Sequence, residues 1–291
     1  MDLGRVGVWW SGSWEVAGQP ELNVGAELEA LGYGAIWSSG GFNRGLSSRF
    51  GRLLAATSRV AVASGIVNIW RASPDDVARG AADLETRYPG RFLLGLGASH
   101  GPVVPEYRRP LSSVRSYLDA LDATVPTVPV DRRVLAALGP RMLELAAERS
   151  AGAHPYFVPP EHTAFAREVM GPGPILAPEV TVVLETDSST ARELARKFTT
   201  GYLTSLPNYV DNLRRLGYTD DDVAGGGSDR LVDAVVAWGD TDAIASRVRE
   251  HHQAGADHVC LQVVADDTGF PLAEYRALAE VFGRLGPGAE G

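Results

Sequence analysis

The chain has 291 residues, of which 45% are hydrophobic and 22% charged, and its formal net charge is -9 at pH 7. Nucleic acids and anionic membrane surfaces are bound through clustered Lys and Arg, so an acidic chain without a basic block argues against both kinds of partner. The length suits either one α/β barrel or two ordinary domains.

Cysteine usage and the first residues bear on the compartment. The single cysteine, Cys260, lies in the apolar run HVCLQVV, which favours a buried structural thiol and excludes an intrachain disulfide. The N-terminal sequence MDLGRVGVWW has no basic segment followed by an apolar stretch, and no run approaches the roughly 18 apolar residues of a membrane span. We therefore expect a cytoplasmic protein.

Strand-like runs alternate with amphipathic helical stretches along the whole chain. The predicted strands cover residues 3–10, 34–38, 60–69, 91–97, 132–139, 153–158, 179–186 and 257–264. The helices that follow them are predicted at 21–31, 47–57, 74–88, 111–122, 140–150, 160–170, 188–203 and 271–285. We also expect a helical excursion at about 205–240 and a flexible tail at about 286–291.

Most of these strands are continuous apolar runs, the pattern of parallel strands covered by helices. Eight such units predict a (β/α)8 TIM barrel that forms one domain over residues 1–291. The competing fold is a doubly wound open sheet. It is weakened because the first predicted strand is not followed by a G-x-G-x-x-G turn.

The residues after the predicted strands would form the active site of such a barrel. They include no pair of acids of the glycosidase type, no His and Asp cluster with metal-ligand spacing and no G-x-S-x-G turn, so we expect no metal site. They do include LGLGASHG (94–101) and ALGPRM (137–142), small residues that allow a phosphate or a flat ring to approach closely.

In ALGPRM, Pro140 follows Gly139 at the start of a predicted helix, with Arg141 beside it. Free N–H groups and the positive end of a helix dipole attract anions, so this segment predicts a phosphate site. An ordinary strand-to-helix turn would explain the same Gly-Pro pair. Glycines in LGLGASHG would likewise serve tight helix packing.

Four segments in order carry a resemblance to a known family: ASGIVN, YPGRFLLGLGASHG, ALGPRMLELAAERSAGAHPY and AGADHVCLQVV. The chain resembles the luciferase-like flavin and deazaflavin oxidoreductases, most of all their coenzyme F-420-dependent branch. The resemblance covers nearly the whole chain. It implies the same (β/α)8 barrel that the strand count predicts.

Gly65 stands inside an apolar strand-like run, where glycine usually marks a bulge or a close approach by another group. The resemblance implies a bulge with a cis peptide bond between Gly65 and Ile66, which backs the ring of the deazaflavin. It also implies that Asn68 faces the ring edge. The full set of cofactor-binding residues that we expect is Ser38, Ser39, Gly65, Ile66, Asn68, Gly97, Ala98, Ser99, Gly139, Pro140 and Arg141.

The chain departs from the family after the second predicted strand. Dehydrogenases of the family carry an acid and a histidine there, whereas this chain has Gly40 and Gly41. After the fourth strand His100 stands where the sugar-phosphate enzymes place a glutamate, and a histidine donates or accepts a proton near neutral pH. We expect His100 to be the catalytic acid or base, and Trp10, Trp70 and Tyr156 to form the substrate pocket, with Trp9 as the alternative to Trp10.

The resemblance implies an oxidoreductase that passes a hydride between coenzyme F-420 and a small organic substrate. Two alternatives stay open: an FMN-dependent luciferase-like monooxygenase, and a flavin- or deazaflavin-binding protein without turnover. A lyase-type barrel is disfavoured because the chain's only lysine, Lys197, falls in a predicted helix. Family members are often dimers, so a homodimer is expected from the resemblance.

Overall fold

The computed structural model describes residues 1–10, 21–40, 45–265 and 269–282. Its strands are β1 (Val6–Trp10), β2 (Ala35–Ser38), β3 (Ala61–Ser64), β4 (Val67–Asn68), β5 (Phe92–Gly97), β6 (Arg133–Leu135), β7 (Gly152–Ala153), β8 (Ile175–Leu176), β9 (Glu179–Val183), β10 (Val236–Trp238) and β11 (Val259–Val263). The expected tail at 286–291 and Gly41 lie outside the described residues.

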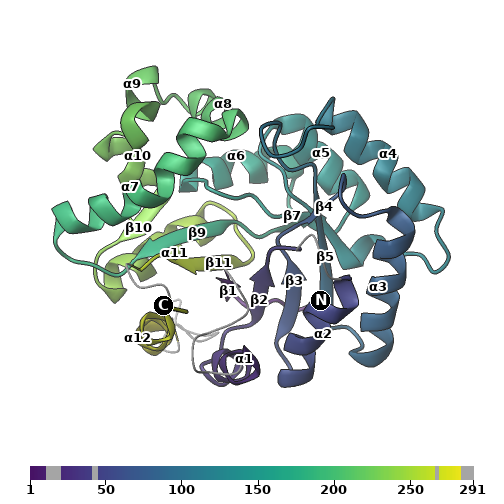
Figure 1. The fold of residues 1–291 in the computed structure, drawn as a ribbon. Helices are drawn as coiled ribbons and strands as arrows, with labels where there is room; N and C mark the ends of the chain where they lie inside the picture. The colour runs from purple at the N-terminus through teal and green to yellow at the C-terminus, as the bar shows by residue number, and fades with distance from the viewer. Residues whose placement is uncertain (11–20, 41–44, 266–268, 283–291) are drawn as a thin grey trace.

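Twelve α-helices are found among the described residues, and most follow a strand on the outside of the sheet (Figure 1). They are α1 (Glu21–Ala30), α2 (Leu46–Ala56), α3 (Pro74–Arg87), α4 (Pro110–Asp122), α5 (Pro140–Arg149), α6 (Pro160–Met170), α7 (Ser188–Ser205), α8 (Pro207–Arg215), α9 (Asp220–Val223), α10 (Asp229–Val235), α11 (Thr241–Gln253) and α12 (Leu272–Phe282), with 3₁₀ turns η1 (Val130–Arg132) and η2 (Ala224–Gly226). None of them is long and apolar enough to cross a membrane.

The strands form one parallel sheet in the order β10-β9-β11-β1-β2-β3-β5-β6-β7-β8, with β4 paired to β5. Only Ala177 and Pro178 separate β8 from β9. The Ala177 N–H donates to Ala153 O of β7, and the Cys260 N–H of β11 donates to Pro178 O. This run therefore contacts β7 on one side and β11 on the other, and the sheet curls back on itself. The predicted (β/α)8 architecture is confirmed.

A bulge divides the third predicted strand into β3 and β4. The Gly65–Ile66 peptide bond at the bulge is cis, as predicted. Backbone hydrogen bonds tie the bulge to the end of β2 and the residues after it, because the Gly65 N–H donates to Ser38 O at 2.7 Å and the Gly40 N–H donates to Ile66 O at 3.1 Å.

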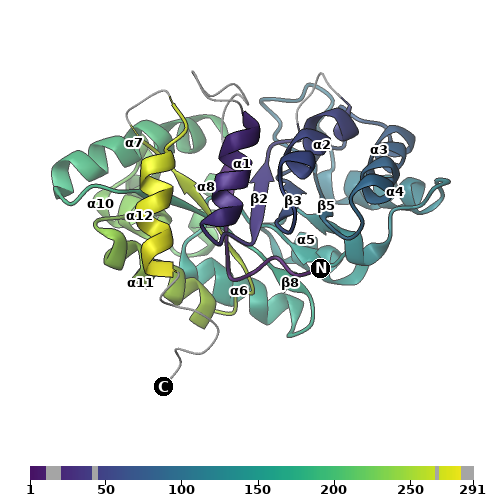
Figure 2. The same ribbon diagram turned by 90° about the horizontal axis from the view of Figure 1, so that it is seen from below.

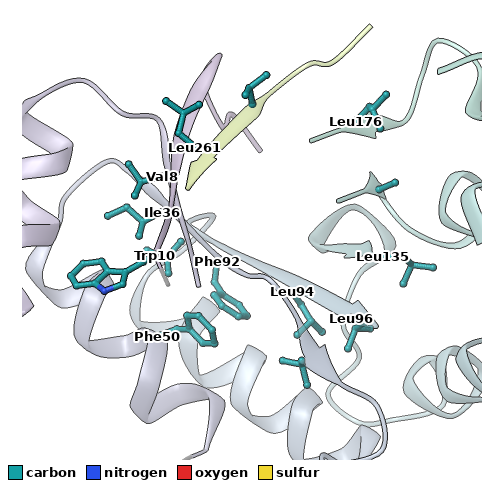
Figure 3. Packing of buried hydrophobic residues seen from close by; sticks show 14 of the residues in the cluster. Val8, Trp10, Ile36, Phe50, Phe92, Leu94, Leu96, Leu135, Leu176 and Leu261 are labelled. Carbon is teal, nitrogen blue, oxygen red and sulfur yellow. The ribbon is translucent and has the colours of Figure 1, made fainter. Parts of the chain in front are cut away.

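Side chains pack on both faces of the sheet. Figure 3 shows the outer core between strands and helices, where Phe50 of α2 meets Phe92 of β5 with ring centroids 5.2 Å apart. A second core fills the barrel interior and includes Trp37, Leu93 and Cys260. Successive strand residues face opposite sides. Strands buried on both faces explain why the apolar runs are continuous.

The excursion predicted at 205–240 contains α8, α9, η2 and α10, and it ends in a strand, β10, that was expected to be helical. β10 pairs in parallel with β9 and is three residues long. Its apolar sequence continues that of α10, so the period of the hydrophobic pattern could not separate strand from helix.

In Figure 2, α1 and α12 lie side by side, and Arg276 of α12 forms an ion pair with Glu27 of α1.

Candidate active site

A cavity of about 990 Å³ opens where β4, β5 and β6 end, beside α7 and α8. Ten of the residues predicted for the site line it: Gly65, Ile66, Asn68, Ala98, Ser99, His100, Gly139, Pro140, Arg141 and Tyr156. The fold therefore brings together the bulge, the loop after β5 and the start of α5, which are far apart in sequence.

Five of the predicted residues do not line the cavity. Ser38 is fully buried and donates to Trp10 O, while Ser39 accepts a hydrogen bond from Arg49. Trp70 does not line the cavity, but its Nε1 donates to the backbone oxygen of the lining residue Ala98 at 2.7 Å. Gly97 gives room to Ile66, because a Cβ at this position would lie 3.0 Å from the Ile66 side chain.

The expectation that Trp10 forms the substrate pocket is corrected by the side of β1 on which it lies. Trp10 faces the outer core and packs on Phe270 with ring centroids 4.5 Å apart. Trp9 faces the interior and lines the cavity. Adjacent strand residues point to opposite faces, so only one of the two tryptophans can reach the cavity.

Gly65 is needed because two side chains approach it from the barrel interior. A Cβ added to Gly65 would lie 2.7 Å from Trp9 Nε1 and 3.1 Å from His154 Nε2. Glycine at position 65 therefore allows these two rings to pack closely against the bulge. His154 is buried and stacks on Trp37, and burial lowers its pKa to about 4.

His100 follows β5 and contacts the helical excursion. Its Nδ1 lies 2.7 Å from Asn208 Oδ1, and its ring centroid lies 5.1 Å from that of Tyr209. Burial lowers the pKa of His100 below its ordinary value, and the hydrogen bond to Asn208 offsets part of that effect. The imidazole is therefore neutral at pH 7 and has one nitrogen ready to accept a proton.

The start of α5 has the features of an anion site. Gly139 precedes the helix, Pro140 occupies its first position, and the Met142 N–H donates back to Gly139 O. The N–H of Arg141, in the first turn, is not used by a bond within the helix and faces this helix end. Arg215 of α8 adds a second cation, because its Nη2 lies 3.7 Å from the Cβ position of Gly139. Asn212 Oδ1 accepts from Arg215 Nη1 at 2.8 Å and holds the side chain there.

Tyrosines form the wall beside β7. Tyr156 OH donates to Gln262 Oε1 at 2.6 Å and lies 2.9 Å from Tyr202 OH. Burial raises the pKa values of both phenols, so both are neutral. Below them, Glu179 is fully buried, and its Oε2 accepts from the Phe157 N–H at 3.2 Å. Burial raises the pKa of Glu179 to about 7.

Several lining residues were not expected from the sequence: Tyr107, His154, Tyr202, Asn208, Tyr209, Asp211 and Arg215. Asn208, Asp211 and Arg215 share one face of α8 by their spacing along the helix. The stretch PNYVDNLRR carries a helical pattern that would place them together, but nothing in the sequence says that this face meets the cavity.

The cavity fits a flat cofactor with a phosphate-bearing tail. Asn68 is buried and its Oδ1 accepts from the Trp70 N–H, while its Nδ2 has no partner among the residues that the structure describes. A buried donor without a partner is costly, and a polar ring edge would satisfy it. Arg141 and Arg215 line the same cavity and would supply the cations for such a tail. Among the described residues no group of three His, Cys, Asp or Glu side chains is placed to hold a metal ion.

Comparisons with solved structures agree with this fold. The chain is similar to an F420-dependent secondary alcohol dehydrogenase in complex with an F420-acetone adduct, with 17% identity, a TM-score of 0.72, and coverage of 95% of this chain and 97% of that chain. It is also similar to a coenzyme F420-dependent tetrahydromethanopterin reductase from Methanopyrus kandleri, with 19% identity, a TM-score of 0.65, and coverage of 88% and 92%.

A third similar structure is the oxygenating constituent of 3,6-diketocamphane monooxygenase from Pseudomonas putida in complex with FMN, with 15% identity, a TM-score of 0.62, and coverage of 95% and 96%. No curated protein matches the chain. The family model described as luciferase-like monooxygenase matches residues 11–258, which is most of the sequence. The chain belongs to the luciferase-like monooxygenase family of enzymes.

Proposed function

We propose that this enzyme is an oxidoreductase that holds the deazaflavin coenzyme F-420 in the cavity and transfers a hydride between its ring and a small organic substrate. One observation carries the proposal: a single cavity joins the glycine bulge, a neutral histidine and a helix N-terminus flanked by two arginines. The structural likeness to two F420-dependent enzymes supports the choice of cofactor.

Each end of the cavity has a separate task in this proposal. The Arg141 N–H and the guanidinium groups of Arg141 and Arg215 would bind the phosphate of the cofactor tail. The backbone at Gly65 and Ile66 would support the ring, and Asn68 Nδ2 would donate to its polar edge. When bound, the deazaflavin ring supplies the hydride donor or acceptor.

His100 would move the proton that accompanies the hydride. When a substrate hydroxyl is oxidised, its carbon loses a hydride and its oxygen loses a proton, and Nε2 of neutral His100 would accept that proton. In the opposite direction the protonated imidazole would return it. The lowered pKa of His100 suits the role of a base, because the ring is unprotonated at neutral pH.

FMN is the second candidate cofactor, favoured by the likeness to an FMN-bound monooxygenase component. The phosphate-binding groups at the start of α5 would serve either cofactor. Titration of the apo-protein with F-420 and with FMN, followed by fluorescence, separates the two. We expect F-420 to bind more tightly. Tighter binding of FMN by an order of magnitude overturns the cofactor choice, and binding of neither overturns the proposed function.

Turnover separates an enzyme from a protein that only binds the cofactor. Reduced F-420 bound to the protein is offered a panel of small carbonyl compounds, and reoxidation is followed by absorbance. We expect at least one acceptor to reoxidise the coenzyme faster than buffer does, with loss of that acceleration in His100→Gln. Tight binding without acceleration by any acceptor supports the binding protein instead.

A further inference from the structure

Helix α8 contacts His100, a residue that precedes it in the sequence by more than a hundred positions. Asn208, in the first turn of α8, places its Oδ1 2.7 Å from Nδ1 of His100, and both residues line the cavity. Pro207 occupies the first position of the helix, which fixes where α8 begins and therefore where Asn208 lies.

With the amide oxygen of Asn208 facing the ring, the bond indicates which nitrogen of His100 carries the proton. A neutral imidazole has one N–H donor and one acceptor nitrogen, and the amide oxygen of Asn208 can only accept. Nδ1 must therefore hold the proton when the ring is neutral, which leaves Nε2 with a free lone pair. The other tautomer would set two acceptors against each other at 2.7 Å.

An amide is the side chain that this role requires. Tyr209 packs against the His100 ring and Tyr107 lies beside the neighbouring Gly101, and both phenols stay neutral because burial raises their pKa values. Asp211 and Arg215 of α8 and Arg141 of α5 line the same cavity. None of these charges appears among the causes of the His100 pKa shift, which are burial and the bond to Asn208. A carboxylate at position 208 would hold His100 as an imidazolium and remove its ability to accept a proton.

We propose that Asn208 is the positioning residue of the active site: it fixes His100 in the tautomer protonated at Nδ1 and so makes Nε2 the atom that exchanges a proton with the substrate. The use made of Nε2 rests on the function proposed above. The tautomer is a property of the protein alone and is tested without cofactor or substrate.

The tautomer is read from long-range ¹H–¹⁵N spectra of the apo-protein labelled at histidine nitrogens. The signals of His100 are identified by their loss in His100→Gln. We expect Nδ1 protonated in the wild type. In Asn208→Leu the preference should disappear and the pKa of His100 should fall, because the bond that raises it is lost. In Asn208→Asp the pKa should rise by about one to three pH units.

Asn212→Leu is the matched control, since Asn212 is a buried asparagine one turn further along the same helix. It should leave the tautomer and the pKa of His100 unchanged. A wild-type ring protonated at Nε2, or an Asn208→Leu protein whose His100 titrates as in the wild type, overturns the proposal. So does an equal shift in Asn212→Leu, which would mark a general effect of disturbing α8.

Kinetics then connect the tautomer to turnover. The pH profile of kcat should move to higher pH in Asn208→Asp, in parallel with the pKa measured by spectroscopy. If the spectra show the predicted tautomer but F-420 does not bind, the proposed function fails and the assignment of Asn208 stands. If F-420 binds and turns over with an unmoved profile in Asn208→Asp, the assignment fails and the proposed function stands.

Discussion

The imidazole of His154 lies almost flat against the indole of Trp37, with ring centroids 4.1 Å apart and planes inclined by 15°. Hydrogen bonds hold both rings, because His154 Nδ1 donates to Ala177 O at 2.6 Å and Trp37 Nε1 donates to His258 Nε2 at 3.1 Å. The barrel interior under Gly65 is thus filled by rings that have little freedom to move.

The first prediction concerns the space at Gly65. Gly65→Ala places a methyl group 2.7 Å from Trp9 Nε1, so the rings must shift, and we expect the free energy of unfolding to fall by about 1–3 kcal/mol. Gly201→Ala is the matched control. Gly201 lies inside α7, where an added Cβ would meet open space among the described residues, and alanine there should stabilise by about 0.5–1 kcal/mol. Urea unfolding of both variants measures the effects, and a Gly65→Ala protein as stable as the wild type contradicts the packing argument.

The second prediction separates the two ends of the cofactor. Arg141→Gln and Arg215→Gln should each weaken F-420 binding by about 1–2 kcal/mol, because a charge-assisted contact to phosphate is lost. Neither should affect a deazaflavin that lacks the phosphate-bearing tail. Arg79→Gln, which removes an exposed cation of α3, should alter neither affinity. An equal loss of affinity for both ligands would contradict the placement of the arginines at the phosphate.

The third prediction uses the buried carboxyl of Glu179. Its pKa is raised to about 7 in the folded state, against 4.5 in the unfolded chain, so the folded state binds more protons between these values. The contribution of Glu179 to stability should fall as pH rises from 4.5 to 7, by about 1.4 kcal/mol per unit, and stay level above 7. Glu179→Gln lacks this contribution, so the free energy of unfolding of the wild type should fall relative to that of the variant over the same pH range. Urea unfolding at pH 5, 6, 7 and 8 tests it, and parallel curves for the two proteins speak against a protonated Glu179.

The fourth prediction has the opposite sign. Burial lowers the pKa of His154, His162 and His258 to about 4 and that of His251 to about 3, so each stays neutral in the fold. The unfolded chain protonates these rings below about pH 6.5. The contribution of these rings to stability should therefore fall as pH drops from 6.5 towards 4, by about 1.4 kcal/mol per unit for each ring. The Glu179→Gln variant shows the change in stability with pH that these histidines cause, because it lacks the opposing contribution of Glu179. NMR titration of the histidines should show four rings still neutral at pH 5.5, and early protonation of all of them contradicts the prediction.

The sequence was sufficient for the barrel and for the start of α5. Apolar runs buried on both faces are long and continuous, and the pair Gly139 and Pro140 combines a strand end with a helix start. These signals are local, so they can be recognised without knowledge of tertiary contacts. The strand β10 was missed because it is short and continues the apolar pattern of α10.

The walls of the cavity could not be predicted in the same way. Trp9 and Trp10 are adjacent, and which of them faces inward depends on the parity of β1 in the closed sheet. Asn208 and Arg215 lie in an ordinary amphipathic helix, and their meeting with His100 and Gly139 depends on how α8 packs against the barrel. Such partners are set by long-range packing, which a single sequence does not reveal.

The segment from α7 to α10 connects β9 to β10, two strands that are paired side by side. A connection between neighbouring strands can change length or sequence without altering the register of the rest of the sheet. This connection also supplies Tyr202, Asn208, Tyr209 and Arg215 to the cavity. In evolutionary terms it is an exchangeable part, through which the shape and charge of the cavity can diverge between relatives while the barrel that supports the bulge and α5 stays the same.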